Sequence, residues 1–315
     1  MRARKTIALL IKGIILSLYT SFAVSQSSAF IGGHCVSING MYVYLGNGED
    51  GILGNFERET ALLEFSKKNG VNYLIFYSLE GVGSDSARQS QLASLISRGR
   101  QSYGIEEVGA ALGSSYGADE IAAYNNGHSA QEKVDVLNLE FEFWNTPERT
   151  EAFNDALQIL NHFRSVASLQ NMQTEIYVGW ITEAEGISLA SAVDRVLVHF
   201  YRQNDTDIIN YGLERLQYLG SGASPVKVAP IFSNEGPDNT GDPTAYFMGP
   251  WLEDHSMDQP YKSWMTGYQQ LTGDWKQNVE VMGGTWFLYN YFADIQNFDQ
   301  NTILSQPQKN SACAG

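Results

Sequence analysis

The sequence predicts a single-domain α/β protein, a (β/α)8 TIM barrel, and three features of the chain point to this fold. Eight apolar runs rich in β-branched and aromatic residues alternate with helical stretches. Such strict alternation favours parallel strands joined by crossover helices. No linker or shift in composition divides the 315 residues. The alternative, an open doubly wound sheet, lacks a glycine-rich phosphate motif after its first strand, where Gly46-Asn47-Gly48 supplies only turn residues.

The strands are expected where short apolar or alternating runs lie between turn signals. In chain order they are Met41–Leu45, Tyr73–Ser78, Glu107–Leu112, Val134–Phe143, Glu175–Trp180, Arg195–Tyr201, Val226–Phe232 and Val281–Tyr289.

Helices are expected between the strands, and the fourth has the clearest signals. Thr146 is its predicted N-cap and Pro147 its first residue, and apolar residues recur at helical spacing from Phe153 to Leu160. The other predicted helices are Phe56–Lys68, Ser86–Arg98, Ala118–Tyr124, Ile187–Val193, Ile208–Leu219, Tyr261–Trp275 and Phe292–Phe298.

The ends of the chain differ from the barrel, which we expect at residues 41–296. Residues 1–25 have a basic start and a short apolar run with small residues at Ala23-Val24-Ser25, which predicts a cleaved signal peptide and a secreted, periplasmic or extracellular protein. An uncleaved anchor is the alternative. Residues 26–40 form a lead-in and residues 297–315 a polar tail. Cys35 and Cys313 permit a disulfide, and two free thiols are equally open.

The charge of the chain restricts its partners. The formal net charge is −15, and removal of residues 1–25, with four positive charges and no acid, leaves −15 − 4 = −19. Such a surface repels nucleic acid and anionic lipid, so we expect neither nucleic acid nor a membrane as a partner. A neutral substrate and a monomer are expected. No motif calls for a cofactor or a metal.

The fourth strand carries the strongest candidate site. Asn138, Glu140 and Glu142 alternate with apolar residues, which predicts that all three lie on one face, about 6.5–7 Å apart. Two neighbouring carboxylates resist double ionisation, so one retains its proton to higher pH, as a general acid requires. An ordinary solvated face has the same pattern. Function is favoured because active sites of such barrels lie at the C-terminal ends of the strands.

Other predicted strands also end in polar and aromatic residues. Each of these aromatic residues could instead belong to the core, but together they favour a sugar-binding cleft. The candidate substrate-binding residues are Asn138, Trp144, Trp180, His199, Trp286 and Tyr289.

At the fourth strand the sequence resembles glycoside hydrolase family 18, the chitinases and endo-β-N-acetylglucosaminidases. The family motif Asp-x-x-Asp-x-Asp-x-Glu is matched by Asp135-x-x-Asn138-x-Glu140-x-Glu142, with both middle acids replaced. Tyr201 matches a family tyrosine, although Arg202 replaces the Asp that follows it. Gly283-Gly284 with Trp286 is similar to an element of the family's last strand, with a shorter spacing, and the family's strand-three Ser-x-Gly-Gly element is missing.

The resemblance implies hydrolysis of β-linked N-acetylglucosamine-containing glycans, either chitin-type oligosaccharides or glycoprotein N-glycan cores. Glu142 would protonate the glycosidic oxygen, while the substrate's own acetamido oxygen attacks the anomeric carbon. Glu140 would orient the acetamido group, Tyr201 would hydrogen-bond its carbonyl, and Trp286 would form the floor of the sugar subsite. Because Glu140 is one methylene longer than the family's Asp, a displacement of about 1 Å would cost roughly a hundredfold in rate.

Three other functions remain open from the sequence. One is a two-carboxylate retaining glycosidase with Glu142 as acid/base and Glu235 as nucleophile. The second is a catalytically weak or inactive, lectin-like barrel, which the altered motif favours. The third is a metal site built from Glu140, Glu142 and His199, although no ligand-spacing motif supports it.

Overall fold

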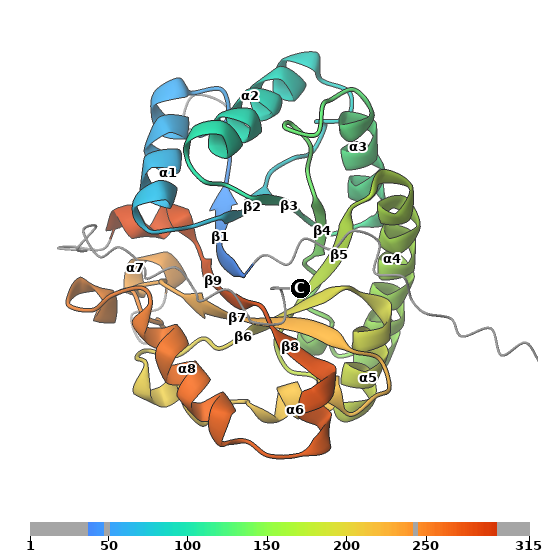
Figure 1. Cartoon of the computed structure of the whole chain (residues 1–315), viewed down its shortest axis with the longest axis vertical. Helices are drawn as coiled ribbons and strands as arrows, with labels where there is room; N and C mark the ends of the chain where they lie inside the picture. The colour runs from blue at the N-terminus through green and yellow to red at the C-terminus, as the bar shows by residue number, and fades with distance from the viewer. Residues whose placement is uncertain (1–36, 47–50, 242–244, 295–315) are drawn as a thin grey trace, which may run out of the picture. The chain divides into compact units, whose positions relative to one another are not determined.

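The computed structural model describes residues 37–46, 51–241 and 245–294, and these form a (β/α)8 barrel. Figure 1 shows the strands at the centre with helices around them. All strand pairs of the ring are parallel. The strands are β1 Ile38–Tyr44, β2 Tyr73–Tyr77, β3 Glu107–Leu112, β4 Val136–Leu139, β5 Gln173–Val178, β6 Arg195–His199, β7 Val226–Ser233, β8 Val279–Val281 and β9 Gly283–Phe287.

Helices cover the outside of the ring. The α-helices are α1 Phe56–Lys68, α2 Ser86–Ser102, α3 Ser115–Asn126, α4 Arg149–Gln170, α5 Glu183–Ala192, α6 Glu214–Gly220, α7 Pro237–Thr240 and α8 Gln259–Gln270. Short 3-10 helices are η1 Phe143–Asn145, η2 Thr206–Ile208, η3 Trp251–Glu253, η4 Asp274–Asn278 and η5 Tyr289–Asp294. Within the described residues no helix is both long and apolar enough to cross a bilayer.

The eighth position of the barrel is filled by two short strands, β8 and β9, in place of the single predicted strand Val281–Tyr289. β8 pairs with the start of β7, whereas β9 pairs with the end of β7 and with β1, which closes the ring. Met282 continues the pairing between them, because its amide donates to Val228 O at 2.9 Å and its carbonyl accepts from Ile38 N at 2.6 Å. Gly283 has φ +126°, and a Cβ there would lie 1.9 Å from Ile38 O, so this junction requires glycine.

Two predicted boundaries around the fourth strand are wrong for a local reason. β4 ends at Leu139 rather than Phe143, because the chain turns into η1 and buries Phe143 and Trp144. α4 begins at Arg149, so Thr146 is not its N-cap; the Thr146 hydroxyl donates to the carbonyl of Phe143 and closes η1 instead.

Other boundaries shift at helix caps and glycines. α5 begins before the predicted Ile187, because Thr182 forms a capping box with Glu185. The predicted helix Ile208–Leu219 is interrupted at Gly212, which has φ +61°, and α6 starts only at Glu214. α8 ends at Gln270, short of the predicted Trp275 and before Gly273 at φ +134°.

The remaining expectations concern the two ends of the chain. β1 begins at Ile38, inside the predicted lead-in. The predicted signal peptide, both cysteines, the tail and the end of the last predicted helix lie outside the described residues.

The interior of the barrel contains a buried ion cluster. Arg195 on β6 donates through Nε to Glu175 on β5 and through Nη2 to Glu107 on β3, the latter at 2.8 Å. The side chains of Arg195, Glu175 and Glu107 are 2%, 0% and 7% exposed. Tyr73 on β2 also donates to Glu175, at 2.8 Å, and lies against the guanidinium. The cluster therefore ties four strands together across the barrel.

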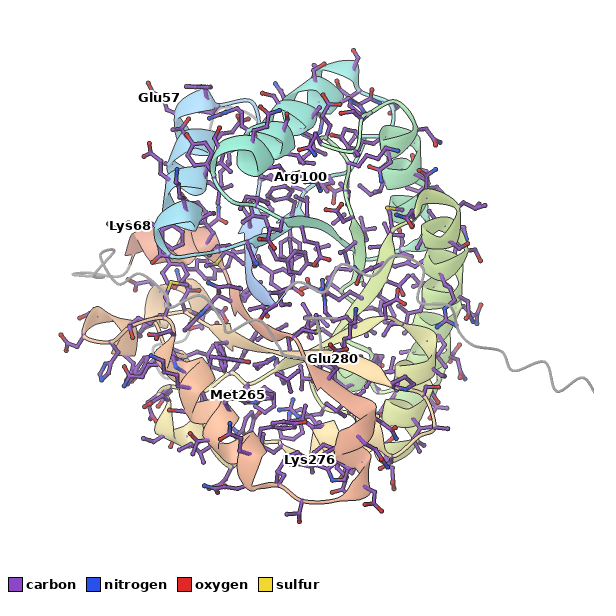
Figure 2. The ribbon with its side chains drawn as sticks, in the orientation of Figure 1. Glu57, Lys68, Arg100, Met265, Lys276 and Glu280 are labelled. Carbon is purple, nitrogen blue, oxygen red and sulfur yellow. The ribbon has the colours of Figure 1, made fainter. Side chains whose placement is uncertain are left out.

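A second ion pair joins helix α2 to the start of β4. Arg100 on α2, labelled in Figure 2, pairs with Asp135 directly before β4, and the same carboxylate accepts from Val108 N at 2.7 Å. Burial raises the pKa of Asp135 to about 6. The first acid of the family-like motif is thus at the N-terminal end of its strand, where it stabilises the fold.

We predict that Arg195→Met lowers the free energy of unfolding by about 3–5 kcal/mol at pH 7, because two buried carboxylates lose their cation. Lys262→Met, which breaks the pair between the exposed Lys262 and Asp258, should cost no more than about 0.5 kcal/mol. Urea unfolding of both variants measures the difference, and equal costs would contradict the assigned role of Arg195.

Candidate functional site

The C-terminal ends of the strands form a polar and aromatic mouth, and Glu140 lies within it. Its amide donates to Leu112 O at 3.0 Å, which extends the β3–β4 ladder by one residue. Its half-buried carboxylate accepts from the hydroxyl of Tyr77, the last residue of β2. Tyr77 in turn stacks on Tyr42 of β1, with ring centroids 5.5 Å apart. Packing between neighbouring strands therefore fixes the position of Glu140.

A pocket of about 370 Å³ opens at this mouth, and Glu140 is the one acid among its lining residues. Aromatic rings supply most of the remaining wall. The lining consists of Tyr44, Tyr77, Glu140, Phe287, Leu288, Asn290 and Tyr291. Such a largely apolar cavity with a single carboxyl group is typical of a small-molecule site.

The pKa of Glu140 is raised to about 7. Burial is the main cause, the neighbouring Glu142 adds to it, and the hydrogen bond from Tyr77 acts in the opposite direction. At neutral pH this carboxyl group is therefore divided between its protonated and ionised forms. It can donate or accept a proton, as general acid–base catalysis requires.

Glu142 lies beyond the end of β4 and is exposed to solvent. The prediction that Asn138, Glu140 and Glu142 share one face of a strand is therefore wrong for Glu142, because the strand ends before this residue. Its carboxylate nevertheless accepts two hydrogen bonds, from Asn145 Nδ2 at 2.6 Å and from the Tyr177 hydroxyl at 3.2 Å. Because Glu142 raises the pKa of Glu140, the two predicted acids lie near each other, but in different surroundings.

Tyr177 on β5 connects Glu142 to His199 at the end of β6. Its hydroxyl is 3.2 Å from His199 Nδ1 as well as from Glu142. Burial, with Arg215 and Arg202 nearby, lowers the pKa of His199 to about 3, so its imidazole is neutral. If the neutral imidazole carries its proton on Nδ1, His199 donates a hydrogen bond to the Tyr177 hydroxyl oxygen. The Tyr177 hydroxyl then donates its own proton in the hydrogen bond to Glu142. Tyr177 is not among the predicted site residues. The sequence feature that could have identified it is its position on β5 two residues after Glu175, which places both side chains on the inner face of the strand.

Asn138 lies beneath the mouth and is fully buried. Its amide donates to Glu175 at 2.7 Å and to the Tyr42 hydroxyl at 3.2 Å. It therefore links the ion cluster to the ring of Tyr42, on which Tyr77 stacks, and does not line the pocket.

Tyr201 follows β6, and the centroid of its ring is 4.9 Å from that of His199 and 6.3 Å from that of Phe287. Burial raises its pKa, and Glu140 and Glu235 are both among the charges that raise it further. Glu235 follows β7, accepts from Ser233 Oγ at 2.7 Å, and has a pKa raised by burial. Tyr201 therefore lies within electrostatic reach of two acids whose strands, β4 and β7, are three pairings apart in the ring.

Two predicted substrate-binding residues lie away from the pocket. Trp286 is 2% exposed and packs on Phe232 and Phe292, so it cannot stack on a sugar. Side chains alternate along a strand, and the next residue, Phe287, faces the pocket instead. Tyr289 packs edge-to-face on Phe65 of α1, outside the barrel.

The two tryptophans after β4 and β5 differ in exposure. Trp144 is 8% exposed and fills the space beside Tyr177 and Gly179, where a Cβ would lie 2.5 Å from its Nε1. Trp180 is 43% exposed and packs edge-to-face on Tyr211. Only Trp180 is therefore free to contact a ligand with its ring.

Asn234, a buried residue after β7, fixes one wall of the pocket. It accepts from Leu288 N at 2.5 Å, donates through Nδ2 to Leu288 O at 3.0 Å, and its amide donates to Phe287 O at 2.9 Å. The sequence carries little signal for this contact, because the partners lie 54 residues apart.

In the part of the chain that is described, no group of three or more His, Cys, Asp or Glu residues is arranged to hold a metal ion. This includes Glu140, Glu142 and His199.

Sequence comparison finds no matching family model and no matching curated protein. Solved structures do resemble the chain. A Bifidobacterium dentium β-glucuronidase aligns over 81% of this chain and 40% of its own, at 10% identity and a TM-score of 0.50. A Bacteroides uniformis β-glucuronidase covers 82% and 31%, at 12% identity and 0.47. A Methylomonas D-allulose 3-epimerase covers 85% and 95%, at 11% identity and 0.46. The chain thus spans less than half the length of either glucuronidase, and at these identities the likeness shows the barrel fold alone.

We predict that Glu140→Gln stabilises the protein in a pH-dependent way. The folded-state pKa of about 7 lies above the ordinary value of 4.5, so the native carboxyl group binds more protons and stability falls as pH rises between these values. The glutamine variant avoids this loss, by at most about 3 kcal/mol at pH 8 and by little at pH 4.5. Urea unfolding at both pH values tests this, with the exposed Glu253→Gln as control. A gain that is the same at both pH values would contradict the raised pKa.

Proposed function

We propose that this protein is a glycoside hydrolase that cleaves β-linked N-acetylglucosamine-containing glycans at the mouth of the barrel. The observation that carries the proposal is Glu140, a carboxyl group with a pKa of about 7 in an aromatic pocket, with a second acid, Glu142, beside it. Apolar rings suit the C–H faces of sugars, and a partly protonated acid suits cleavage of an acetal.

The geometry favours Glu140 as the general acid and Glu142 as the partner of the acetamido group. The family resemblance implies the opposite assignment, with Glu142 as the acid. Glu140 lines the pocket and retains its proton near neutral pH. Glu142 is exposed, and its carboxylate accepts hydrogen bonds from Tyr177 and Asn145, so it is positioned as a hydrogen-bond acceptor. The longer side chain at position 140 then serves to deliver a proton.

In the proposed reaction Glu140 transfers its proton to the glycosidic oxygen as the bond from that oxygen to the anomeric carbon breaks. The acetamido oxygen of the substrate bonds to the same carbon and forms a cationic ring. Glu142 accepts a hydrogen bond from the acetamido N–H and stabilises the positive charge. Water then attacks the anomeric carbon, loses a proton to the Glu140 carboxylate, and reopens the ring with net retention.

We predict that Glu140→Gln and Glu142→Gln differ in their dependence on the leaving group. Glu140→Gln should lower kcat on a chitooligosaccharide by roughly 10²–10⁴-fold. It should affect a 2,4-dinitrophenyl N-acetylglucosaminide far less, because that leaving group needs no proton. Glu142→Gln should slow both substrates alike.

Steady-state hydrolysis of the two substrates, with Glu253→Gln as control, measures this difference. The reverse pattern would return the acid role to Glu142. If the unmodified protein binds the oligosaccharide without turnover, the barrel is a glycan-binding protein and the proposal fails.

A two-carboxylate retaining glycosidase is the second candidate, and one observation favours it. Glu235 has a raised pKa and acts on Tyr201 together with Glu140. Such an enzyme needs carboxyl groups about 5–5.5 Å apart, one of them as nucleophile. In this reading Glu140, rather than Glu142, would be the acid/base partner of Glu235.

We predict that Glu235→Ala lowers turnover only modestly and gains nothing from azide, because the acetamido group is the nucleophile in the leading proposal. Activity restored by azide, with a glycosyl azide among the products, would establish Glu235 as the nucleophile. Product analysis by mass spectrometry makes the distinction.

A further inference from the structure

Two arginines that follow β6 form no ion pair with a carboxylate of the described residues. Arg202 lies three residues after β6, and Arg215 is the second residue of α6. Several other arginines of the described chain do pair with acids, namely Arg98, Arg100, Arg149 and Arg195. Acids are abundant in a chain with a net charge of −15, so two cations without a carboxylate partner at one place call for an explanation.

Arg215 is fully buried, and one of its nitrogen atoms has no acceptor. Its Nε donates to Gly212 O at 2.9 Å, and its Nη1 donates to Gly179 O at 2.8 Å. Its Nη2 is buried and has no hydrogen-bond partner among the described residues. Gly212 adjoins this atom, and a Cβ at that position would collide with it, so glycine leaves space beside Nη2. A buried donor without an acceptor is costly, and a ligand oxygen would satisfy it.

The surroundings of Arg215 do not compensate its charge. The pKa of Arg215 is lowered to about 10, chiefly by burial and also by Arg202. Tyr211 and Glu214 act in the opposite direction, but Glu214 is exposed and forms no ion pair with the guanidinium. A buried cation in these surroundings is stabilised by an anion that reaches it.

The two guanidinium groups lie close together and beside the candidate site. Arg202 Cζ is 3.1 Å and Arg215 Cζ is 5.4 Å from the ring centre of Tyr211, so the two charges are no farther apart than these distances combined. Both arginines also lower the pKa of His199, whose Nε2 is buried without a partner among the described residues. His199 Nδ1 lies 3.2 Å from the hydroxyl of Tyr177, which is the hydrogen-bond partner of the second acid.

The arginine pair is accessible on one side. Arg202 is half-buried, and its Nη1 donates to the carbonyl of Tyr201 at 3.1 Å. Trp180, which is 43% exposed, has its ring 4.8 Å from the Arg215 guanidinium, so that Arg215 lies beneath a surface side chain. Guanidinium groups suit the oxygens of carboxylate and sulfate, because each presents a planar fork of N–H donors.

We propose that Arg202 and Arg215 bind an oxyanion at the mouth of the barrel, and that the glycan bound there contains acidic sugar units, which carry a carboxylate or a sulfate group. Arg202 contacts the anion directly, and Arg215 stabilises it from below. This differs from the neutral substrate that the net charge of the chain predicts. The identification of the ligand as a glycan rests on the proposed function, whereas the anion site does not depend on turnover.

The preference for an acidic over a neutral glycan tests this site. Two pairs of probes differ only in charge. One pair is a hyaluronan hexasaccharide and the same hexasaccharide with its carboxyl groups reduced to alcohols; the other is 6-O-sulfated chitotetraose and chitotetraose. Calorimetry on the full chain with Glu140→Gln measures binding without cleavage. At least one acidic probe should bind roughly 10- to 100-fold more tightly than its neutral partner, and that probe identifies the anion.

Variants of the two arginines locate the preference. Arg202→Gln, made in the same background, should remove most of the preference and leave the affinity for the neutral probe within about twofold, because only the charge-assisted contact is lost. Arg164→Gln is the matched control, because it removes one positive charge at an exposed position of α4. Arg215→Gln should act like Arg202→Gln. Urea unfolding shows whether this buried variant folds, and Arg202→Gln decides the test if it does not.

The outcomes distinguish this inference from the proposed function. Equal affinities within both pairs of probes, or a preference that survives Arg202→Gln, overturn the anion site even if chitooligosaccharides are hydrolysed. If no glycan binds, the NMR signals of the arginine Nε–H groups decide. Shifts of the Arg202 and Arg215 signals with D-glucuronate or sulfate, and not with D-glucose, support the anion site although the proposed function fails. The absence of a shift with either anion overturns the site.

Discussion

The ion pair between Arg195 and Glu175 inside the barrel is the interaction on which the site depends. A charge in this interior is tolerated only with its partner, so the pair fixes the register of β5 and β6 against each other. Asn138 donates to Glu175 from β4 and contacts Tyr42 on β1. Tyr42 supports the ring of Tyr77, which donates to Glu140. The links on this route are an ion pair, three hydrogen bonds and one ring stacking, and together they connect the buried ion cluster to the pocket.

Glu140 and Glu142 differ in their properties because one is half-buried and the other is exposed. Glu140 is one residue past its strand, and burial holds it partly protonated. Glu142 is three residues past the strand, exposed, and surrounded by donors. Two chemically identical side chains, two residues apart, thus lie in different surroundings, and in proteins such a difference can separate the properties of paired acids.

The fold could be predicted from the sequence because its signals are local, whereas much of the site depends on distant contacts. The helix Phe56–Lys68 and the strand Glu107–Leu112 have the predicted bounds, since caps and apolar runs define them. The end of β4 could not be predicted, because alternation continues to Phe143 although the chain has already turned. Alternation also cannot say which of Trp286 and Phe287 faces inward, and nothing near Asn234 in the sequence reveals its bonds to the last strand.

The pocket lies at the seam where the barrel closes. Tyr44 ends the first strand, and Asn290 follows the last, and they bond across a separation of 246 residues. Contacts of such long range are slow to form, because a large loop must close first. Tyr44 and Phe287 meet around the cavity only when β1 and β9 pair, so a partly synthesised chain lacks a binding site. The topology therefore sets when the pocket forms during folding, because this cavity exists only in the completely closed ring.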